Sequence, residues 1–126
     1  MLQGNFFDIT NLEMTGFDVK ADLVINAGHN IFEGHFPGQP VVPGVCMMQM
    51  IKEIMEQVTG KSSDLIKAGE MKFLAIIDPR QNNILQAKLK YAIEINGNMR
   101  VVATLFKDEI IHFKFNGLFD LQDRHA

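Results

Sequence analysis

GHFPGQPVVPG, residues 34–44, places three prolines and three glycines around one histidine, His35. Each proline fixes its own φ and disfavours helical geometry in the residue before it, so we expect extended backbone at Phe36, Gln39 and Val42. This stiff loop should hold the imidazole of His35 in one position. Histidine is the side chain that most often takes and returns a proton near neutral pH, so the loop predicts a general base.

An apolar helix is predicted directly after this loop. Residues 45–51 read VCMMQMI and are apolar at every position except Gln49, which indicates that the first half of the helix is buried on all sides. We expect the helix to run from about residue 43 or 44 to 58, with Gly60 as its C-cap. Its second half carries polar residues and should be amphipathic.

Alternating apolar and polar residues predict strands in much of the remaining chain. The expected strands are Phe17–Ile25, then 87–95 and 101–105 joined by a turn at Asn96-Gly97, a last strand after a turn at Asp108-Glu109, a strand over 70–77 before Pro79, and a short strand at Ile31-Phe32. His112, Lys114 and Asn116 are expected on the outward face of the last strand, residues 61–63 are expected to be a loop, and no element is assigned to residues 1–16.

These elements indicate an α+β domain. Several strands with one apolar face need a single apolar body to cover, which a curved antiparallel sheet wrapped around one central helix provides. At 126 residues the chain has the size of one domain, so we expect residues 1–126 to form it.

Composition argues against several classes of partner. The chain is 47% hydrophobic and 21% charged with a formal net charge of −3, and no run of Lys or Arg offers a nucleic-acid surface. No stretch approaches the roughly 20 apolar residues of a membrane span, and the start lacks the pattern of a secretory signal. Cys46 is the single cysteine, which excludes an internal disulfide and favours a reducing cytoplasm.

The loop and the helix after it resemble the 3-hydroxyacyl-[acyl-carrier-protein] dehydratases of the hotdog fold, whose motif reads approximately G-H-F-P-x-x-P-x-x-P-G. Seven positions match: Gly34, His35, Phe36, Pro37, Pro40, Pro43 and Gly44. Residues 72–79, KFLAIIDP, look more weakly like the basic-aromatic strand that precedes a proline turn in that family. The resemblance implies a lyase of fatty acid or related lipid biosynthesis that acts on acyl carrier protein or acyl-CoA thioesters, without a metal or other cofactor, as a homodimer or a higher oligomer.

The resemblance also implies a site. His35 would be the base, and backbone N–H groups around Gly44 and Val45 would bind the enolate oxygen. Phe36 and Pro43 would line the substrate-binding site. In the family, the histidine of one protomer works with an acidic residue from the helix of the other. Met47, Met48 and Met50 would border the acyl tunnel.

Gln49 departs from the family pattern, because a glutamate or aspartate stands at this position in the family. An amide has no proton to release near neutral pH, although it can orient water or bind a substrate hydroxyl. Glu53, one helical turn further on, and Glu33 are alternative acids, and both are also typical of surface carboxylates.

Several alternatives stay open at this point. The protein could be a non-catalytic subunit, one half of a heterodimeric dehydratase, or a hotdog thioesterase, and His35 could only hold the loop. Cys46 could be a thiolate nucleophile or a buried structural thiol. His29, Glu33 and His35 have no known metal-ligand spacing, and His125 lies in a tail that should fray. The residues do not predict acyl chain length or carrier.

Overall fold

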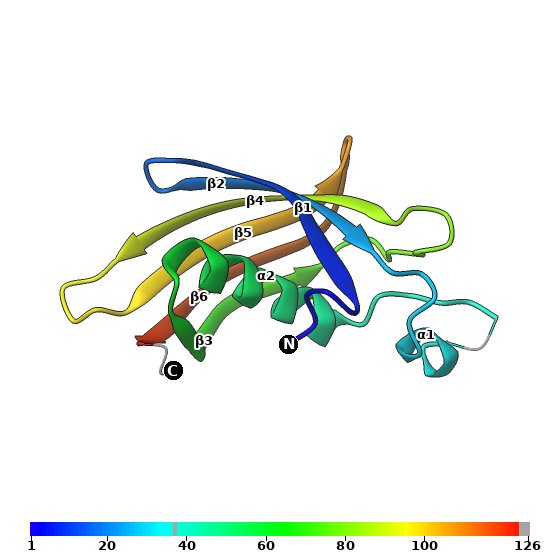
Figure 1. Cartoon of the computed structure of the whole chain (residues 1–126), viewed down its shortest axis with the longest axis horizontal. Coiled ribbons are helices and arrows are strands. Elements are labelled where there is room, and N and C mark those ends of the chain that lie inside the picture. The colour runs from blue at the N-terminus through cyan, green and yellow to red at the C-terminus, as the bar shows by residue number, and fades with distance from the viewer. Residues whose placement is uncertain (37, 124–126) are drawn as a thin grey trace.

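One sheet and one long helix dominate the described part of the chain. The computed structural model describes residues 1–36 and 38–123 (Figure 1). In chain order the elements are β1 (Phe7–Thr15), β2 (Asp18–Ile25), α1 (Ile31–Gly34), α2 (Gly44–Thr59), β3 (Ser62–Phe73), β4 (Ile84–Ile93), β5 (Met99–Lys107) and β6 (Ile110–Gln122).

The strands form a single antiparallel sheet that curves around α2 (Figure 1). Their order is β1-β2-β4-β5-β6-β3, so β1 and β3 are the edges. The inner strands β2, β4, β5 and β6 bury an apolar face on the helix side, because alternate side chains point to opposite faces of a sheet. The fully buried core includes Val19, Leu23, Leu85, Leu105, Phe113 and Phe119 from the sheet and Met50, Ile51, Ile54 and Met55 from α2. The predicted hotdog architecture is therefore confirmed.

The central helix matches its prediction closely. It begins at Gly44 and ends at Thr59, one residue later than expected. Gly60 caps it in the left-handed conformation, with φ 70° and ψ 15°, and its N–H donates to the carbonyl of Glu56 at 2.9 Å. No helix in residues 1–36 and 38–123 is long and apolar enough to cross a membrane.

The structure differs from the predicted elements in three regions. β1 is an additional strand, and it escaped prediction because most of its residues are exposed at the sheet edge and a bulge interrupts its pairing with β2. The other edge strand, β3, starts inside the predicted loop at 61–63 and ends at Phe73 instead of residue 77. Residues 31 and 32 lie in helix α1 rather than in a strand, because the backbone closes helical turns here: the N–H of Glu33 donates to the carbonyl of Asn30 at 3.0 Å and the N–H of His35 to that of Ile31 at 3.2 Å.

Side-chain direction also differs at both ends of the sheet. Phe17 and Ile93 were expected in the core but are exposed, because they lie at hairpin ends. His112 was expected on the outward face, yet it is only 5% exposed. The segment after β3 covers it: the N–H of Leu74 donates to the carbonyl of His112 at 2.9 Å, and His112 Nδ1 lies 3.1 Å from the carbonyl oxygen of Ala75.

The left-handed cap of α2 yields a stability prediction. Gly60→Ala should lower the free energy of unfolding by about 1 kcal/mol, because a Cβ is strained at positive φ. Gly34→Ala is the matched control, since Gly34 has open space around its Cα and no positive φ. Urea unfolding followed by circular dichroism should separate the two variants, and an equal loss in both would contradict this account of the cap.

Candidate functional site

The first turn of α2 presents unpaired backbone donors. Pro43 is the N-cap and has no capping side chain. Its carbonyl accepts from the N–H groups of Cys46 at 3.0 Å and Met47 at 3.2 Å. The N–H groups of Gly44 and Val45 have no hydrogen-bond partner within the described residues. Such N–H groups at the positive end of a helix favour an oxygen that carries negative charge.

An apolar hollow of about 400 Å³ lies beside this helix start. Its lining comes from the end of the loop, the first turn of α2 and the segment that leaves β3: Val41, Val42, Gly44, Met47, Phe73, Leu74, Ala75 and Ile76. A Cβ on Gly44 would lie 2.7 Å from Cε1 of Phe73, so only glycine lets the aromatic ring approach the backbone here. The hollow suits an apolar chain attached to a polar carbonyl group.

Only part of the predicted methionine lining is found at this hollow. Met47 lines it, whereas Met50 is completely buried in the core and Met48 is half-buried without lining the hollow. An acyl tunnel bordered by all three methionines stays a prediction, because Met47 alone of the three lines this hollow. Their spacing along the helix turns them toward different neighbours.

His35 follows α1 and has an exposed side chain. Its N–H donates to the carbonyl of Ile31 at 3.2 Å and its carbonyl accepts from Val41 at 2.9 Å. The imidazole lies near the exposed ring of Phe36, with 5.1 Å between the ring centroids. Within one chain the imidazole does not line the hollow, and no described hydrogen bond joins it to Gly44, Val45 or Gln49.

The backbone of the His35 loop is closed by short hydrogen bonds. The N–H of Phe36 donates to the carbonyl of Gln39 at 2.9 Å, and the N–H of Gln39 donates back to the carbonyl of Phe36 at 2.9 Å. Further along, the N–H of Val42 donates to the carbonyl of Ile77 at 2.9 Å. The expected restraint from Pro37 lies outside the described residues. Hydrogen bonds nevertheless hold the loop at two places, at the turn between Phe36 and Gln39 and at Val42 just before α2.

Side chains from the segment after β3 brace the same loop. Asp78 accepts from Gln39 Nε2 at 3.3 Å, and Arg80 donates to the carbonyl of Gly38 at 3.3 Å. Burial works to raise the pKa of Asp78, but the backbone N–H and guanidinium of Arg80, together with Gln39, outweigh it and lower that pKa below its ordinary value. The sequence showed no signal for this contact, since nearly 40 residues separate its two sides.

Gln49 and Glu53 form a polar pair on α2. Gln49 is half-buried, and its Nε2 donates to Oε2 of Glu53 at 2.8 Å. Glu53 is 1% exposed and also accepts from the backbone N–H groups of Leu2 and Gln3, both at 2.8 Å. The interpretation of Glu53 as a solvated surface carboxylate was wrong. The N-terminal residues that bury it showed no pattern in the sequence.

The other candidate groups are less suited to chemistry. Burial raises the pKa of the Cys46 thiol, which favours the neutral thiol over a thiolate. Within the described residues no group of three or more His, Cys, Asp or Glu side chains could hold a metal ion. His29 Nδ1 accepts the N–H of Ile31 at 3.0 Å, Glu33 is exposed, and His125 lies outside the described residues.

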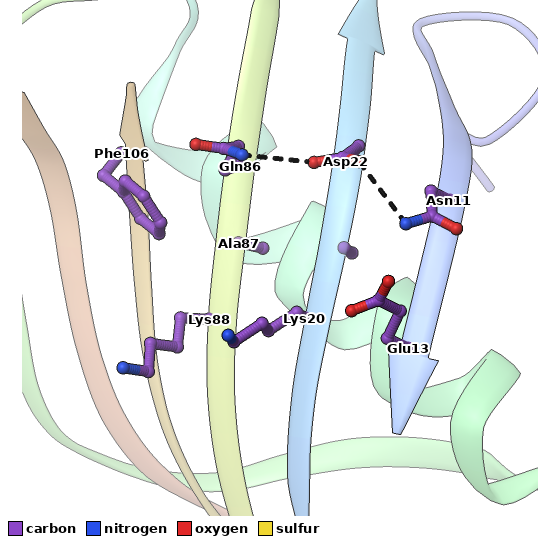
Figure 2. Close-up of a pocket in the computed structure, with 9 residues that line it drawn as sticks. Asn11, Glu13, Lys20, Asp22, Gln86, Ala87, Lys88 and Phe106 are labelled. Carbon is purple, nitrogen blue, oxygen red and sulfur yellow. Dashed lines mark hydrogen bonds between the residues drawn. The ribbon is translucent and has the colours of Figure 1, made fainter. Parts of the chain in front are cut away.

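A second hollow, of about 350 Å³, lies on the face of the sheet turned away from α2 (Figure 2). It is lined by charged and amide side chains of β1, β2 and β4. Asp22 accepts there from Gln86 at 3.4 Å and from Asn11 at 3.5 Å, while Lys20, Lys88 and Glu13 surround the rest. None of the predicted site residues lines this hollow, and its lining contains no histidine or cysteine.

Comparisons with known proteins identify the family of the chain. The family model described as ApeI dehydratase matches residues 11–116. The chain is similar to 3-hydroxyacyl-[acyl-carrier-protein] dehydratase FabZ of three organisms: Mannheimia succiniciproducens (38% identical over 48% of this chain and 39% of that one), Blochmanniella floridana (28%, over 94% and 73%) and Sodalis glossinidius (32%, over 79% and 62%). The chain thus spans between about two fifths and three quarters of the length of these relatives.

Two solved structures share the fold. The dehydratase heterocomplex ApeI:P from Xenorhabdus doucetiae superposes with a TM-score of 0.70 at 18% identity, over 89% of this chain and 96% of that chain. Cj0977, a sigma28-regulated virulence protein from Campylobacter jejuni, gives a TM-score of 0.69 at 15% identity, over 91% and 85%. With the family model covering most of the sequence and the sheet and helix arranged as described, the chain belongs to the ApeI-like dehydratase family of hotdog proteins.

Proposed function

We propose that this protein is a dehydratase-like lyase of fatty acid or related lipid biosynthesis, acting on 3-hydroxyacyl thioesters of acyl carrier protein or coenzyme A. The observation that carries the proposal is the start of α2, where Gly44 has an N–H without a described partner and also lines the apolar hollow. This combination suits a thioester whose carbonyl meets the helix end while its acyl chain occupies the hollow. Membership of the dehydratase family supports the same reaction class.

The chemistry follows from the properties of these groups. The imidazole of His35 would take the proton from the carbon next to the thioester carbonyl, and the N–H groups of Gly44 and Val45 would stabilise the enolate oxygen. The hydroxyl group on the next carbon must then gain a proton and leave as water. Gln49 has no proton to give near neutral pH. In a homodimer, therefore, the imidazolium of His35 must return the proton that it took.

A second copy of the chain would complete the site. His35 is exposed and separate from the hollow within one chain, so a partner is needed to bring an imidazole to a helix start. Exposed apolar side chains lie around this region, namely Phe36, Val45, Phe73, Leu74 and Ile76. The neighbouring edge strand β3 also has one side without a partner strand. Exposed apolar patches and free strand edges are typical of interaction surfaces.

A second candidate function is favoured by Gln49 itself. The chain could be one subunit of a dehydratase heterocomplex, in which a partner helix that bears Glu or Asp supplies the acid. The structural neighbour ApeI:P is described as a heterocomplex, which supports this possibility. In that arrangement the chain would contribute His35 and the loop around it, while the acidic partner would protonate the leaving hydroxyl group.

The role of His35 can be measured directly. His35→Ala should reduce interconversion of 3-hydroxyacyl and enoyl thioesters by at least about 100-fold, because the general base is lost. The melting temperature should change little, since the imidazole is exposed. His29→Ala is the control histidine variant and should retain turnover. Enoyl absorbance measures the reaction, and release of free thiol would instead identify a thioesterase. Full turnover by His35→Ala would rule out the proposed base.

Gln49→Glu tests whether the rest of the machinery is intact. The new side chain would be a carboxyl group, which can carry a proton, whereas the amide of Gln49 has none to release near neutral pH. That proton could be given to the leaving hydroxyl, and dehydration should rise roughly 100-fold. Gln49→Met, which cannot hold a proton, should give no increase. An unchanged rate in Gln49→Glu would favour the heterocomplex subunit over the self-sufficient enzyme.

The proposed interface predicts which apolar residues control assembly. Ile76→Glu should convert the dimer to monomer, because Ile76 is 67% exposed and lies at the hollow that the second copy would cover. Val102→Glu is the matched control, since Val102 is 50% exposed on the opposite face of the sheet. Light scattering after gel filtration gives the mass of each variant. Dissociation by Val102→Glu alone would place the interface on the other face.

A further inference from the structure

Lysine side chains form a row across one face of the sheet. Lys20 on β2 lies opposite Lys88 on β4, and Lys114 on β6 lies opposite Lys72 on β3. Thr104 on β5 lies between the two pairs, opposite both Lys88 and Lys114. All of these lysines are exposed. Because neighbouring strands are about 4.8 Å apart, this lysine row is roughly 19 Å long and runs perpendicular to the strands.

The lysine row lies on the face of the sheet turned away from α2. The residues on either side of Lys114 are phenylalanines buried in the core, so the alternation of the strand turns Lys114 outward. Figure 2 shows Lys20 and Lys88 on adjacent strands at this outer face. Lys72 shares the face because it is the cross-strand partner of Lys114. The row is therefore separate from the hollow at the start of α2.

The pairing within the row opposes the stability of the sheet. Like charges directly opposite each other on neighbouring strands are destabilising, and the row contains two such pairs. In the next row along β2 and β4, by contrast, the register places Asp18 opposite Lys90. Folding alone would favour that second kind of pairing, so the lysine row is better explained by a bound anionic partner.

Most of the amino groups in the row are free of acidic neighbours. Within residues 1–36 and 38–123, no carboxylate lies at ion-pair distance from Lys20, Lys88 or Lys114. Lys72 lies 3.9 Å from Glu70 at the edge of the sheet. The charges are therefore open to a partner from outside the chain.

The shape of the row restricts the class of partner. Carboxylates flank it, with Asp18 and Glu70 in the next row on one side and Asp22 on the other. The positive charge is thus confined to a line on the convex side of the sheet (Figure 1). A flat membrane would also meet the flanking carboxylates, and a second copy stacked row on row would set lysine against lysine. A nucleic-acid strand carries a charge about every 3.4 Å, which is denser than one lysine per strand.

We propose that the lysine row is a docking surface for an acidic helix of a partner protein. Successive turns of a helix are about 5.4 Å apart, close to the spacing of strands. A helix with one carboxylate per turn on a single face would therefore meet successive lysines, with its middle turn over Thr104. These contacts would offset the repulsion within the row. The inference goes beyond the proposed function, because the row shares no residue with the hollow.

A synthetic helix tests the row directly. The probe is a fluorescent, alanine-rich helical peptide about five turns long that carries one glutamate per turn on a single face. The comparison peptide has the same composition, with its glutamates spread around the helix. Fluorescence anisotropy at low ionic strength measures binding to the full chain. We expect the aligned peptide to bind at least about 10-fold more tightly, because only its charges match the row. Equal binding of both peptides, or of neither, would overturn the inference.

Charge reversal within the row gives the second measurement. Lys88→Glu combined with Lys114→Glu should weaken binding of the aligned peptide at least about 10-fold. Lys61→Glu combined with Lys67→Glu is the matched control, because it makes the same change in net charge at two exposed lysines outside the row. The control should bind nearly as well as the parent. An equal loss in both double variants would reveal a response to net charge alone and would overturn the inference.

The row variants are expected to fold. Lys88→Glu places a carboxylate opposite Lys20, and Lys114→Glu places one opposite Lys72, so each like-charge pair becomes an opposite-charge pair. The melting temperature should stay the same or rise. If the charge reversal disturbs folding, Lys88→Gln combined with Lys114→Gln, which only removes the charges, decides the outcome by the same comparison.

Two other polyanions test the choice of partner. Vesicles that contain phosphatidylserine and a single-stranded DNA oligonucleotide of the same charge as the peptide should both bind more weakly than the aligned peptide. Tighter binding of either one, lost in the row variants, would assign the row to a membrane or to nucleic acid. That result would overturn the proposed acidic helix.

Discussion

Burial of α2 against the concave face of the sheet is the constraint on which the rest of the structure depends. The helix is apolar on nearly every side in its first half, so it is stable only when covered. One curved sheet covers it, and the ends of the helix then emerge at the rim of the sheet. The N–H groups of Gly44 and Val45, which have no partner among the described residues, lie there beside apolar side chains of the segment that follows β3.

The candidate site is divided within one chain, because the His35 loop and the hollow at the start of α2 are formed by different segments at the rim of the sheet. The loop that carries His35 is held by its own turn and by Asp78 and Arg80 from a distant segment. The hollow at the helix start is lined by other residues. The loop and the hollow both lie in a region of exposed apolar side chains. A second subunit would bring its His35 to the hollow of the first, and its own hollow would receive the His35 of the first. Assembly and catalysis would then depend on the same surface.

Gln49 shows how one neutral side chain can be specialised by its neighbour. It stands where the resemblance to the dehydratases places an acid, and an amide has no proton to release near neutral pH. Glu53, the nearby carboxylate, accepts hydrogen bonds on both oxygens from the backbone N–H groups of Leu2 and Gln3. The carboxylate also acts on the orientation of Gln49. A buried charge that is satisfied by fixed donors is well suited to this, since it cannot move without losing several hydrogen bonds.

The sequence by itself determined the buried helix with its glycine cap, the antiparallel strands with strict alternation, and the motif around His35, because each depends on local geometry or on a regular period. It did not reveal the edge strand β1 or the first part of the edge strand β3, where most residues are exposed and no such period appears. Only the tertiary structure decided that His112 and Glu53 are buried and that Asp78 braces the His35 loop. These features arise where segments distant in sequence meet, and no local pattern encodes such contacts.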